Sequence, residues 1–371
     1  MTNLFTKIDI PASDLQIDYK SRLAFFGSCF ADNISAQFAA RKFNVLANPF
    51  GTVYNPLSLA RQLKAIADRK VFAKDDVFQD MRLNNSAAPW HCWDAHSSLS
   101  AATQEECIAK LNAAANSARD FLQKADTVFI TLGTSFVYFL KENGSAGENV
   151  SPSRVIANCH RQDPRLFERR MIPVNEAAEA IEEIVESLCK IKNDWTLRSI
   201  QDDNKEKGLH HIQDDEKAEN REMHIVFTVS PLRHMSDGAH SNTLSKATLQ
   251  LAVNEVIKKY ESSTEKSTPT SSISHFPSYE IVMDELRDYR FYDSDMVHLS
   301  KTAEEYIFER MEETYCNEKT RESIRQVERF LKMSNHRIQD ADSPATAAFL
   351  QKLQAEAAKL ESQIEGLHLD M

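Results

Sequence analysis

The sequence predicts an α/β fold with a parallel, doubly wound sheet. Short apolar runs typical of buried strands lie near residues 23–26, 44–47, 127–132, 224–229 and 280–283. Amphipathic stretches separate them, and helices are expected near residues 57–67, 104–124, 175–191, 241–260 and 300–314. Helix start signals stand at Asn55-Pro56 and Ser241-Asn242. Strands that alternate with helices in this way form parallel sheets whose crossover helices cover both faces.

The first predicted strand ends at a turn that presents a hydroxyl and a thiol together. The run Leu23–Phe26 is followed by Gly27, Ser28 and Cys29, and Ala31–Phe43 is expected to be the next helix. Side chains at such a turn lie beside the first N–H groups of the helix, where negative charge is favoured. The turn is therefore typical of one that exposes a nucleophilic side chain. An ordinary strand-to-helix connection with a buried cysteine is the structural alternative, and this segment by itself leaves both open.

Two polar segments are expected to leave the sheet as solvated excursions. Residues 200–222 are rich in Asp, Asn, Lys, Glu and His, and residues 261–275 are rich in Ser, Thr, Lys and Pro. His210 and His211 lie in the first of these segments. We interpret them as surface histidines and not as metal ligands.

After about residue 317 the sequence changes to charged helical segments. Residues 1–316 are expected to form the main domain and residues 317–371 a C-terminal helical extension. A heptad seam runs through the last segment, with apolar residues at Leu350, Leu353, Ala357, Leu360, Ile364 and Leu367. The seam is short for an independent coiled coil. It therefore fits equally a helix packed against its own domain and a helix that forms a homodimer.

Composition excludes several functional classes. The 371 residues carry 44 Lys and Arg against 55 Asp and Glu, and the net charge of −11 argues against nucleic acid as a partner. Because Met1–Ile10 lacks a signal-peptide pattern and no apolar run is long enough to span a bilayer, we expect a soluble, cytoplasmic protein without a membrane span. The six cysteines lie far apart without a C-x-x-C pair, so we interpret them as free thiols. No metal or other cofactor is expected.

A carboxylate and an imidazole stand three residues apart near the end of the main domain. In a turn, this spacing brings the Asp295 carboxylate to one nitrogen of His298 and leaves the other nitrogen free to take a proton. The preceding charged segment, Asp284–Arg290, is expected to form an ion-pair network that positions this loop. The pair follows the last predicted strand, whereas the Gly27 turn follows the first. Because the carboxyl ends of parallel strands lie along one edge of a sheet, the two are expected to meet there.

The run Gly27-Ser28-Cys29-Phe30-Ala31 spells the motif of the GSCFA family, and the chain resembles that family over about residues 1–315. Further matching segments are Asn48–Pro56, Trp90–Ser97, Thr131–Thr134, Asn158–Arg161, Thr228–His234 and Asp284–Arg290. The family is grouped with the SGNH (GDSL-like) hydrolases. The resemblance implies a flavodoxin-like, three-layer α/β/α fold of the SGNH-hydrolase type with insertions, in a bacterial protein.

The resemblance places Cys29 where SGNH hydrolases have their nucleophilic serine and Ser28 where they have the preceding aspartate. A thiol becomes nucleophilic when a neighbouring base or helix end favours the thiolate. Cys29 activated by His298, with Asp295 orienting the imidazole, is therefore chemically reasonable. A slight shift of the turn presents Ser28 instead, and the sequence leaves this choice open while favouring Cys29.

The oxyanion hole implied by the resemblance is incomplete. Gly51 resembles the glycine whose N–H joins that hole in SGNH enzymes, and a tight turn is its structural alternative. The block Gly133-Thr134-Ser135 lacks the asparagine that is usual there. Thr134, Ser135 or another group therefore has to donate the hydrogen bond to the oxyanion. Loss of one such donor slows acyl transfer by about a hundredfold or more, so this departure weakens the hydrolase hypothesis.

A further set of residues is expected to bind substrate. Indoles beside polar side chains suit the apolar face of a sugar or an acyl group, as a lid or pocket wall, although packing of an insertion explains them too. A divalent metal held by His91, Asp94 and His96 is disfavoured by their spacing. The pairs His160-Arg161 and Arg233-His234 add hydrogen-bond donors that would hold a phosphate or carboxylate of the substrate. Structural salt bridges explain the two arginines equally well. The set comprises Trp90, His91, Trp93, His96, His160, Arg161, Arg233 and His234.

These expectations lead to two hypotheses of function. The first is an SGNH-like acyl hydrolase or acyltransferase that acts on an ester or thioester of a small molecule or glycan, with a carbohydrate-linked acyl group as the favoured substrate. The second is a catalytically inactive module of the same fold that binds a glycan or nucleotide-sugar, motivated by the departures at Ser28 and Thr134. Fold alone does not decide between them.

Overall fold

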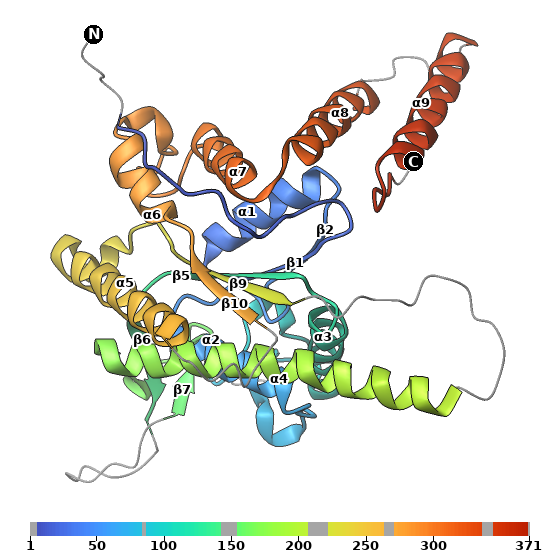
Figure 1. The fold of residues 1–371 in the computed structure, drawn as a ribbon. Helices are drawn as coiled ribbons and strands as arrows, with labels where there is room; N and C mark the ends of the chain where they lie inside the picture. The colour runs from blue at the N-terminus through green and yellow to red at the C-terminus, as the bar shows by residue number, and fades with distance from the viewer. Residues whose placement is uncertain are drawn as a thin grey trace.

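The main sheet of the computed structural model is parallel, with five strands in the order β10-β9-β5-β1-β2 (Figure 1). The structure describes residues 6–83, 87–141, 154–206, 222–262, 271–335 and 344–369, without the side chains of residues 195–206, 271 and 345. His210 and His211 lie outside the described residues. No helix in the described ranges combines the length and the apolar character needed to cross a bilayer.

The strand order identifies where a ligand is expected to bind. The strands are β1 (Arg22–Gly27), β2 (Asn44–Ala47), β5 (Thr127–Leu132), β9 (Met223–Val229) and β10 (Ser271–His275). Counted along the chain, the sheet strands lie in the flavodoxin-like order 2-1-3-4-5. The order reverses between β1 and β5, and ligands of such sheets bind outside the carboxyl ends at this switch point. The predicted α/β/α fold is confirmed.

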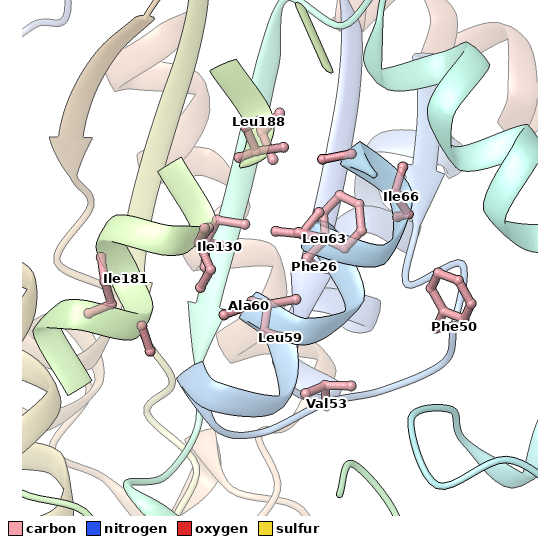
Figure 2. Close-up of a cluster of buried hydrophobic side chains, with 14 of the residues drawn as sticks. Phe26, Phe50, Val53, Leu59, Ala60, Leu63, Ile66, Ile130, Ile181 and Leu188 are labelled. Carbon is pink, nitrogen blue, oxygen red and sulfur yellow. The ribbon is translucent and has the colours of Figure 1, made fainter. Parts of the chain in front are cut away.

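Side chains alternate between the two faces of the sheet. Leu23 and Phe25 face one apolar core, and Ala24 and Phe26 face the other. The first core is covered by helices α1 (Cys29–Ala40), α7 (Lys301–Tyr315), α8 (Glu318–Ser334) and α9 (Pro344–Gln363). The second is covered by α2 (Pro56–Ala67), α3 (Gln104–Leu122), α4 (Val174–Glu206) and α5 (Ala239–Ser262), and part of it is shown in Figure 2.

Local sequence explains where several helices begin. Asn55 caps α2, since its side chain accepts a hydrogen bond from the N–H of Ser58 at 2.9 Å, and Ser300 caps α7 in the same way. The predicted start at Ser241 is two residues late, because α5 begins at Ala239 directly after Gly238. Helix α4 continues to Glu206, so the first part of the segment that was expected to be a solvated excursion is helical.

The predicted strand at residues 280–283 is wrong. Residues Ser278–Glu280 form α6 and Ile281–Glu285 form a single π-helical turn, whose Ile281 and Val282 are buried against the first core. The fifth strand is β10, in the segment expected to be a solvated excursion. A short apolar run fits a buried helix as well as a strand, and β10 is a polar edge strand that pairs only with β9.

Two small antiparallel sheets lie outside the main sheet and were not predicted. One pairs β3 (Phe78–Gln79) with β4 (Trp90–His91). The other has the order β7-β6-β8, with β6 at Phe136–Leu140, β7 at Arg154–Ile156 and β8 at Phe167–Met171. Both belong to the insertions expected within the domain.

The C-terminal seam packs against its own chain. Its inner residues, Leu353, Ala357, Leu360, Ile364 and Leu367, are buried in the same core as Leu15, Ile17 and Tyr19 near the N-terminus. Leu350, at the start of the seam, is 42 % exposed. Of the two interpretations of this heptad pattern, the described structure therefore has the intramolecular one, and the surface expected to form a homodimer is largely covered.

Candidate active site

A glycine fixes the turn that ends β1. Gly27 pairs with Thr131 of β5 and has φ of +126°, and a Cβ at this position would lie 2.0 Å from the Thr131 carbonyl oxygen. The N–H of Gly27 donates to Asn48 Oδ1 at 2.8 Å, and the N–H of Ser28 donates to the Thr131 carbonyl at 3.2 Å. Only glycine allows this close approach of β1 and β5. The turn is therefore held from both neighbouring strands.

Cys29 is the first residue of α1, and its thiol lies at the N-terminus of that helix. The backbone N–H groups of Cys29 and Phe30 point toward the sulfur and lower the pKa of the thiol. Burial and the negative charge of Asp32 act more strongly in the opposite direction, so the net pKa is raised. Cys29 is partly exposed. It rests as a thiol and needs a base to become a nucleophile.

Ser28 occupies the N-cap position of α1, but its hydroxyl is turned inward. It is 1 % exposed, and its Oγ is without a hydrogen-bond partner among the described residues. Gly133 lies directly behind it, since a Cβ on that glycine would be 3.3 Å from Ser28 Cβ. Of the two candidate nucleophiles, Cys29 is the one that reaches the surface.

Asp32 braces the turn from the first turn of α1. Its carboxylate accepts hydrogen bonds from Asn48 Nδ2 at 2.6 Å and from Thr52 Oγ1 at 3.0 Å. Because Asn48 also accepts from Gly27, one network links the start of α1, the end of β1 and the loop after β2. This rigid support is what a preorganised nucleophile requires.

The contact expected between Asp295 and His298 is present. Nδ1 of His298 lies 2.5 Å from Asp295 Oδ2, and Asp295 Oδ1 accepts the backbone N–H groups of Val297 and His298 at 2.9 Å each. The hydrogen bond from His298 is the main reason why the pKa of Asp295 falls to about 2. Since Nδ1 faces the carboxylate, Nε2 is the nitrogen left to exchange a proton.

The loop with His298 lies near the turn with Cys29. The side chain of Asn33, one turn after Cys29, donates to Glu304, one turn after Ser300, at 2.5 Å. The helix starts that follow the two loops are therefore side by side. In the described structure no hydrogen bond joins His298 to Ser28 or Cys29. Such contacts are often long in a ligand-free site and tighten when substrate binds.

The charged segment before this loop forms three separate ion pairs. Asp284 pairs with Arg287 and Asp288 pairs with Arg290, both on the surface. The third pair is buried: Glu285 lies 3.2 Å from Arg310 Nη1 and accepts the Tyr306 hydroxyl at 2.8 Å. The Glu285 pair thus fixes the π-helical turn to α7, and the expected network is reduced to this one buried anchor.

The candidate oxyanion donors have partners inside the protein. The Gly51 N–H donates to the Asn48 carbonyl at 2.7 Å, as in a tight turn. The Thr134 N–H donates to the Tyr54 carbonyl at 2.9 Å, and the Ser135 N–H donates to Ser245 Oγ at 2.7 Å. Their oxyanion role stays a prediction. The N–H groups of Cys29 and Phe30, at the start of α1, lie beside the Cys29 sulfur instead.

The tryptophan-rich insertion builds a small core of its own. Trp93 stacks on Phe78 at 3.7 Å between ring centroids, and His91 stacks on His160 at 4.5 Å. His160 Nε2 lies 2.7 Å from the Cys92 carbonyl oxygen. These buried rings hold the insertion together, so their substrate-binding role stays a prediction.

The remaining residues of the insertion also have local partners. Trp90 pairs within the β3–β4 sheet, and the backbone N–H of His96 donates to the Phe50 carbonyl at 2.8 Å. The side chain of Asp94 pairs with Arg61 and Arg154. His91, Asp94 and His96, the three residues considered for a metal, therefore do not share a site in this part of the chain.

The sequence analysis missed two residues at the carboxyl edge of the sheet. Tyr54 follows the Gly51 turn, and its ring meets the ring of His234 edge-on at 5.2 Å. Lys246 reaches the edge from α5 and is 1 % exposed. A signal for Lys246 exists, because the lysine continues the spacing of the apolar Leu249, Ala252 and Val256 on a helical face that also carries Asn242 and Ser245.

Arg233 and His234 also lie at this edge, whereas Arg161 is an exposed residue beside the insertion. Burial is the main reason why the pKa of His234 is lowered, followed by the positive charge of Lys246, with a smaller contribution from His298. The structure therefore brings Cys29, His234 and His298 to one edge, with the insertion residues grouped separately.

The family model of the GSCFA family matches residues 22–201 and 192–311. The chain belongs to the GSCFA family. The match includes both the turn after β1 and the loop with Asp295 and His298, and it ends within α7. Comparisons of this GSCFA protein with curated proteins and with solved structures find no match.

Proposed function

We propose that this GSCFA protein is an acyl hydrolase or acyltransferase with Cys29 as its nucleophile. The observation that carries the proposal is the position of the Cys29 thiol on the first N–H groups of α1, at the switch point of the sheet and partly exposed. Ser28 is buried behind it. The resemblance to SGNH hydrolases supports the same assignment.

In the proposed reaction His298 is the general base and acid. The Cys29 sulfur attacks the carbonyl carbon of an ester or thioester while its proton passes to His298 Nε2. The N–H groups of Cys29 and Phe30 stabilise the negative charge on the carbonyl oxygen. The intermediate collapses to an acyl-thioester on Cys29, and His298 returns the proton to the leaving alcohol or thiol. Water or an acceptor hydroxyl then removes the acyl group by the same steps.

The substrate proposed is an acyl group on a small molecule or glycan. Arg233 and His234, at the same edge as Cys29, support this class as hydrogen-bond donors to a phosphate or carboxylate of the substrate. We propose the bacterial cytoplasm as the location. All six cysteines are free, which suits a reducing compartment.

A panel of acyl esters and thioesters tests the proposal with wild type and four variants. Cys29→Ala and His298→Ala are each expected to lower kcat by about a hundredfold or more. Ser28→Ala is expected to retain most of the activity, and Cys159→Ala is the control for the other partly exposed thiol. Mass spectrometry should detect an acyl adduct on the peptide that contains Cys29. Turnover that survives both Cys29→Ala and His298→Ala would exclude this centre.

The same panel addresses the second hypothesis. The occupied N–H groups of Gly51, Thr134 and Ser135 favour a module of the same fold that binds a glycan or nucleotide-sugar without reacting with it. Saturable binding of such a ligand with no turnover of any ester or thioester, and no acyl adduct, would support the module. Turnover that depends on Cys29 would exclude it.

A further inference from the structure

Lys246 is a buried lysine whose side chain spans the carboxyl ends of two sheet strands. Its Nζ donates to the carbonyl oxygens of Gly133, after β5, and Ser230, after β9, at 2.6 Å each. Gly133 is the residue that lies behind Ser28. The ammonium group is thus placed next to the turn that carries Ser28 and Cys29.

The charges around Lys246 are unusual for a buried lysine. Burial, followed by the positive charge of Arg233, lowers the pKa of Lys246 to about 7, and Cys29 is the group that acts to raise it. No carboxylate is among the charges that act on it in the described structure. His234 also faces it with a positive charge when protonated.

The thiol of Cys29 has the complementary surroundings. Burial and then Asp32 raise the pKa of Cys29, whereas the N–H groups at the start of α1 and, with a smaller contribution, Lys246 lower it. Tyr54 is a further titratable group beside Cys29. Because interaction between two titrating groups is mutual, a thiolate at Cys29 favours the ammonium form of Lys246 and the ammonium favours the thiolate.

We propose that Lys246 is a positioning residue of this site, whose ammonium group supplies the positive charge that stabilises the Cys29 thiolate. The inference rests on the proposed function only in taking Cys29 as the nucleophile. It deepens that function by naming the group that compensates the negative charge formed when Cys29 gives up its proton.

A second buried lysine shows what a purely structural role looks like. Lys192 is 5 % exposed, and its Nζ donates to the carbonyl oxygen of Ala125 at 3.0 Å, before β5 at the opposite edge of the sheet. The charge that raises the pKa of Lys192 is a carboxylate, Asp126. For Lys246, the group that acts to raise the pKa is the thiol of Cys29. Lys192→Met is therefore the matched control for Lys246→Met.

Alkylation of Cys29 by iodoacetamide tests the inference on the intact chain. The rate is followed across a range of pH, and labelled peptides are quantified by mass spectrometry. In Lys246→Met, labelling of Cys29 is expected to be up to about tenfold slower below about pH 7, where wild-type Lys246 carries its charge, and to approach the wild-type rate at higher pH. Lys246→Arg, which keeps the charge, is expected to restore the profile toward wild type. Lys192→Met is expected to leave it unchanged.

Three results would overturn the inference: a Cys29 profile in folded Lys246→Met that coincides with wild type, an equal change at Cys159, or an equal change in Lys192→Met. If Lys246→Arg does not fold, the comparison of the two methionine variants decides. Alkylation needs no acyl substrate. If wild type turns over no acyl substrate but Lys246→Met still shows the expected change in Cys29 labelling, the proposed function is rejected and the role of Lys246 is retained.

Discussion

At the scale of the residue, Gly51 and Gly238 share a positive φ but not an environment. Their φ angles are +80° and +78°. A Cβ on Gly51 would lie 2.2 Å from His96 Cβ, whereas nothing lies within 4 Å of the corresponding position on Gly238. The first glycine is needed for close packing as well as for its backbone angle, and the second for the angle alone.

Alanine at the two positions should therefore have unequal effects. Gly238→Ala is expected to lower the free energy of unfolding by about 2 kcal/mol, because φ of 78° with ψ of 151° strains the backbone of any residue with a Cβ. Gly51→Ala is expected to lower it by about 3 kcal/mol or more, since His96 and the insertion must also move. Urea denaturation measures both. Equal losses would mean that the Gly51 turn can separate from His96 without a penalty.

Residues with a local signature were the ones that the sequence revealed. Cys29 and the Asp295–His298 contact depend on neighbours along the chain, and motif reasoning found them together with Gly27, whose close approach to Thr131 only the fold shows. Lys246 depends on carbonyl groups that distant strands bring together. The inward orientation of Ser28 depends in the same way on Gly133. Neither relation is visible before the fold is known.

At the scale of the element, α9 tests how the C-terminal seam is used. Leu360 is 4 % exposed within the core shared with the N-terminal segment, and Leu350 is 42 % exposed on the same helix. The two leucines have the same helix propensity, so their substitution separates burial from helix formation.

Leu360→Ala is expected to lower the free energy of unfolding by about 2–5 kcal/mol, because it leaves a cavity. Leu350→Ala is expected to change it by about 0.5 kcal/mol or less. Thermal unfolding at several protein concentrations measures both effects. A Tm that rises with concentration, together with equal losses at both positions, would instead indicate a dimer through the seam.

The type of an element was predicted correctly where the hydrophobic periodicity extends over a long segment, and wrongly where the apolar run is short. The helices of the main domain agree with the prediction in place and, apart from α4, which continues to Glu206, nearly in length, and so do β1, β2, β5 and β9. The four-residue run at 280–283 carried no periodicity that could separate a strand from a helix. The edge strand β10 was missed because its alternation is polar.

At the scale of the whole molecule, a buried histidine couples folding to pH. His160 is 3 % exposed, and burial lowers its pKa from an ordinary value of 6.5 to about 4. As pH falls below 6.5, the unfolded chain takes up this proton before the folded chain does. The folded state therefore loses stability between about pH 6.5 and about pH 4, and the His160 contribution is constant below that range.

His160→Gln removes this titration but keeps a hydrogen-bond donor for the Cys92 carbonyl. Wild type is expected to lose up to about 3 kcal/mol more than the variant between neutral pH and about pH 4, given 1.36 kcal/mol per pKa unit. Denaturant unfolding at a series of pH values gives the difference. His368→Gln, at an exposed position, is the control. Parallel curves for wild type and His160→Gln would show that the ring is accessible to protons in the folded state.

The pairing of β1 with β5 determines when the site can exist during synthesis. Gly27 lies opposite Thr131, about 100 residues later, and the His298 loop follows after a further long stretch of chain. On the ribosome, the turn with Cys29 emerges early and lacks its neighbours. Its support from Thr131 forms only when β5 is available, and His298, its proposed base, arrives after nearly the whole family domain has been made. A nascent chain therefore holds its thiol without the groups that would make it reactive.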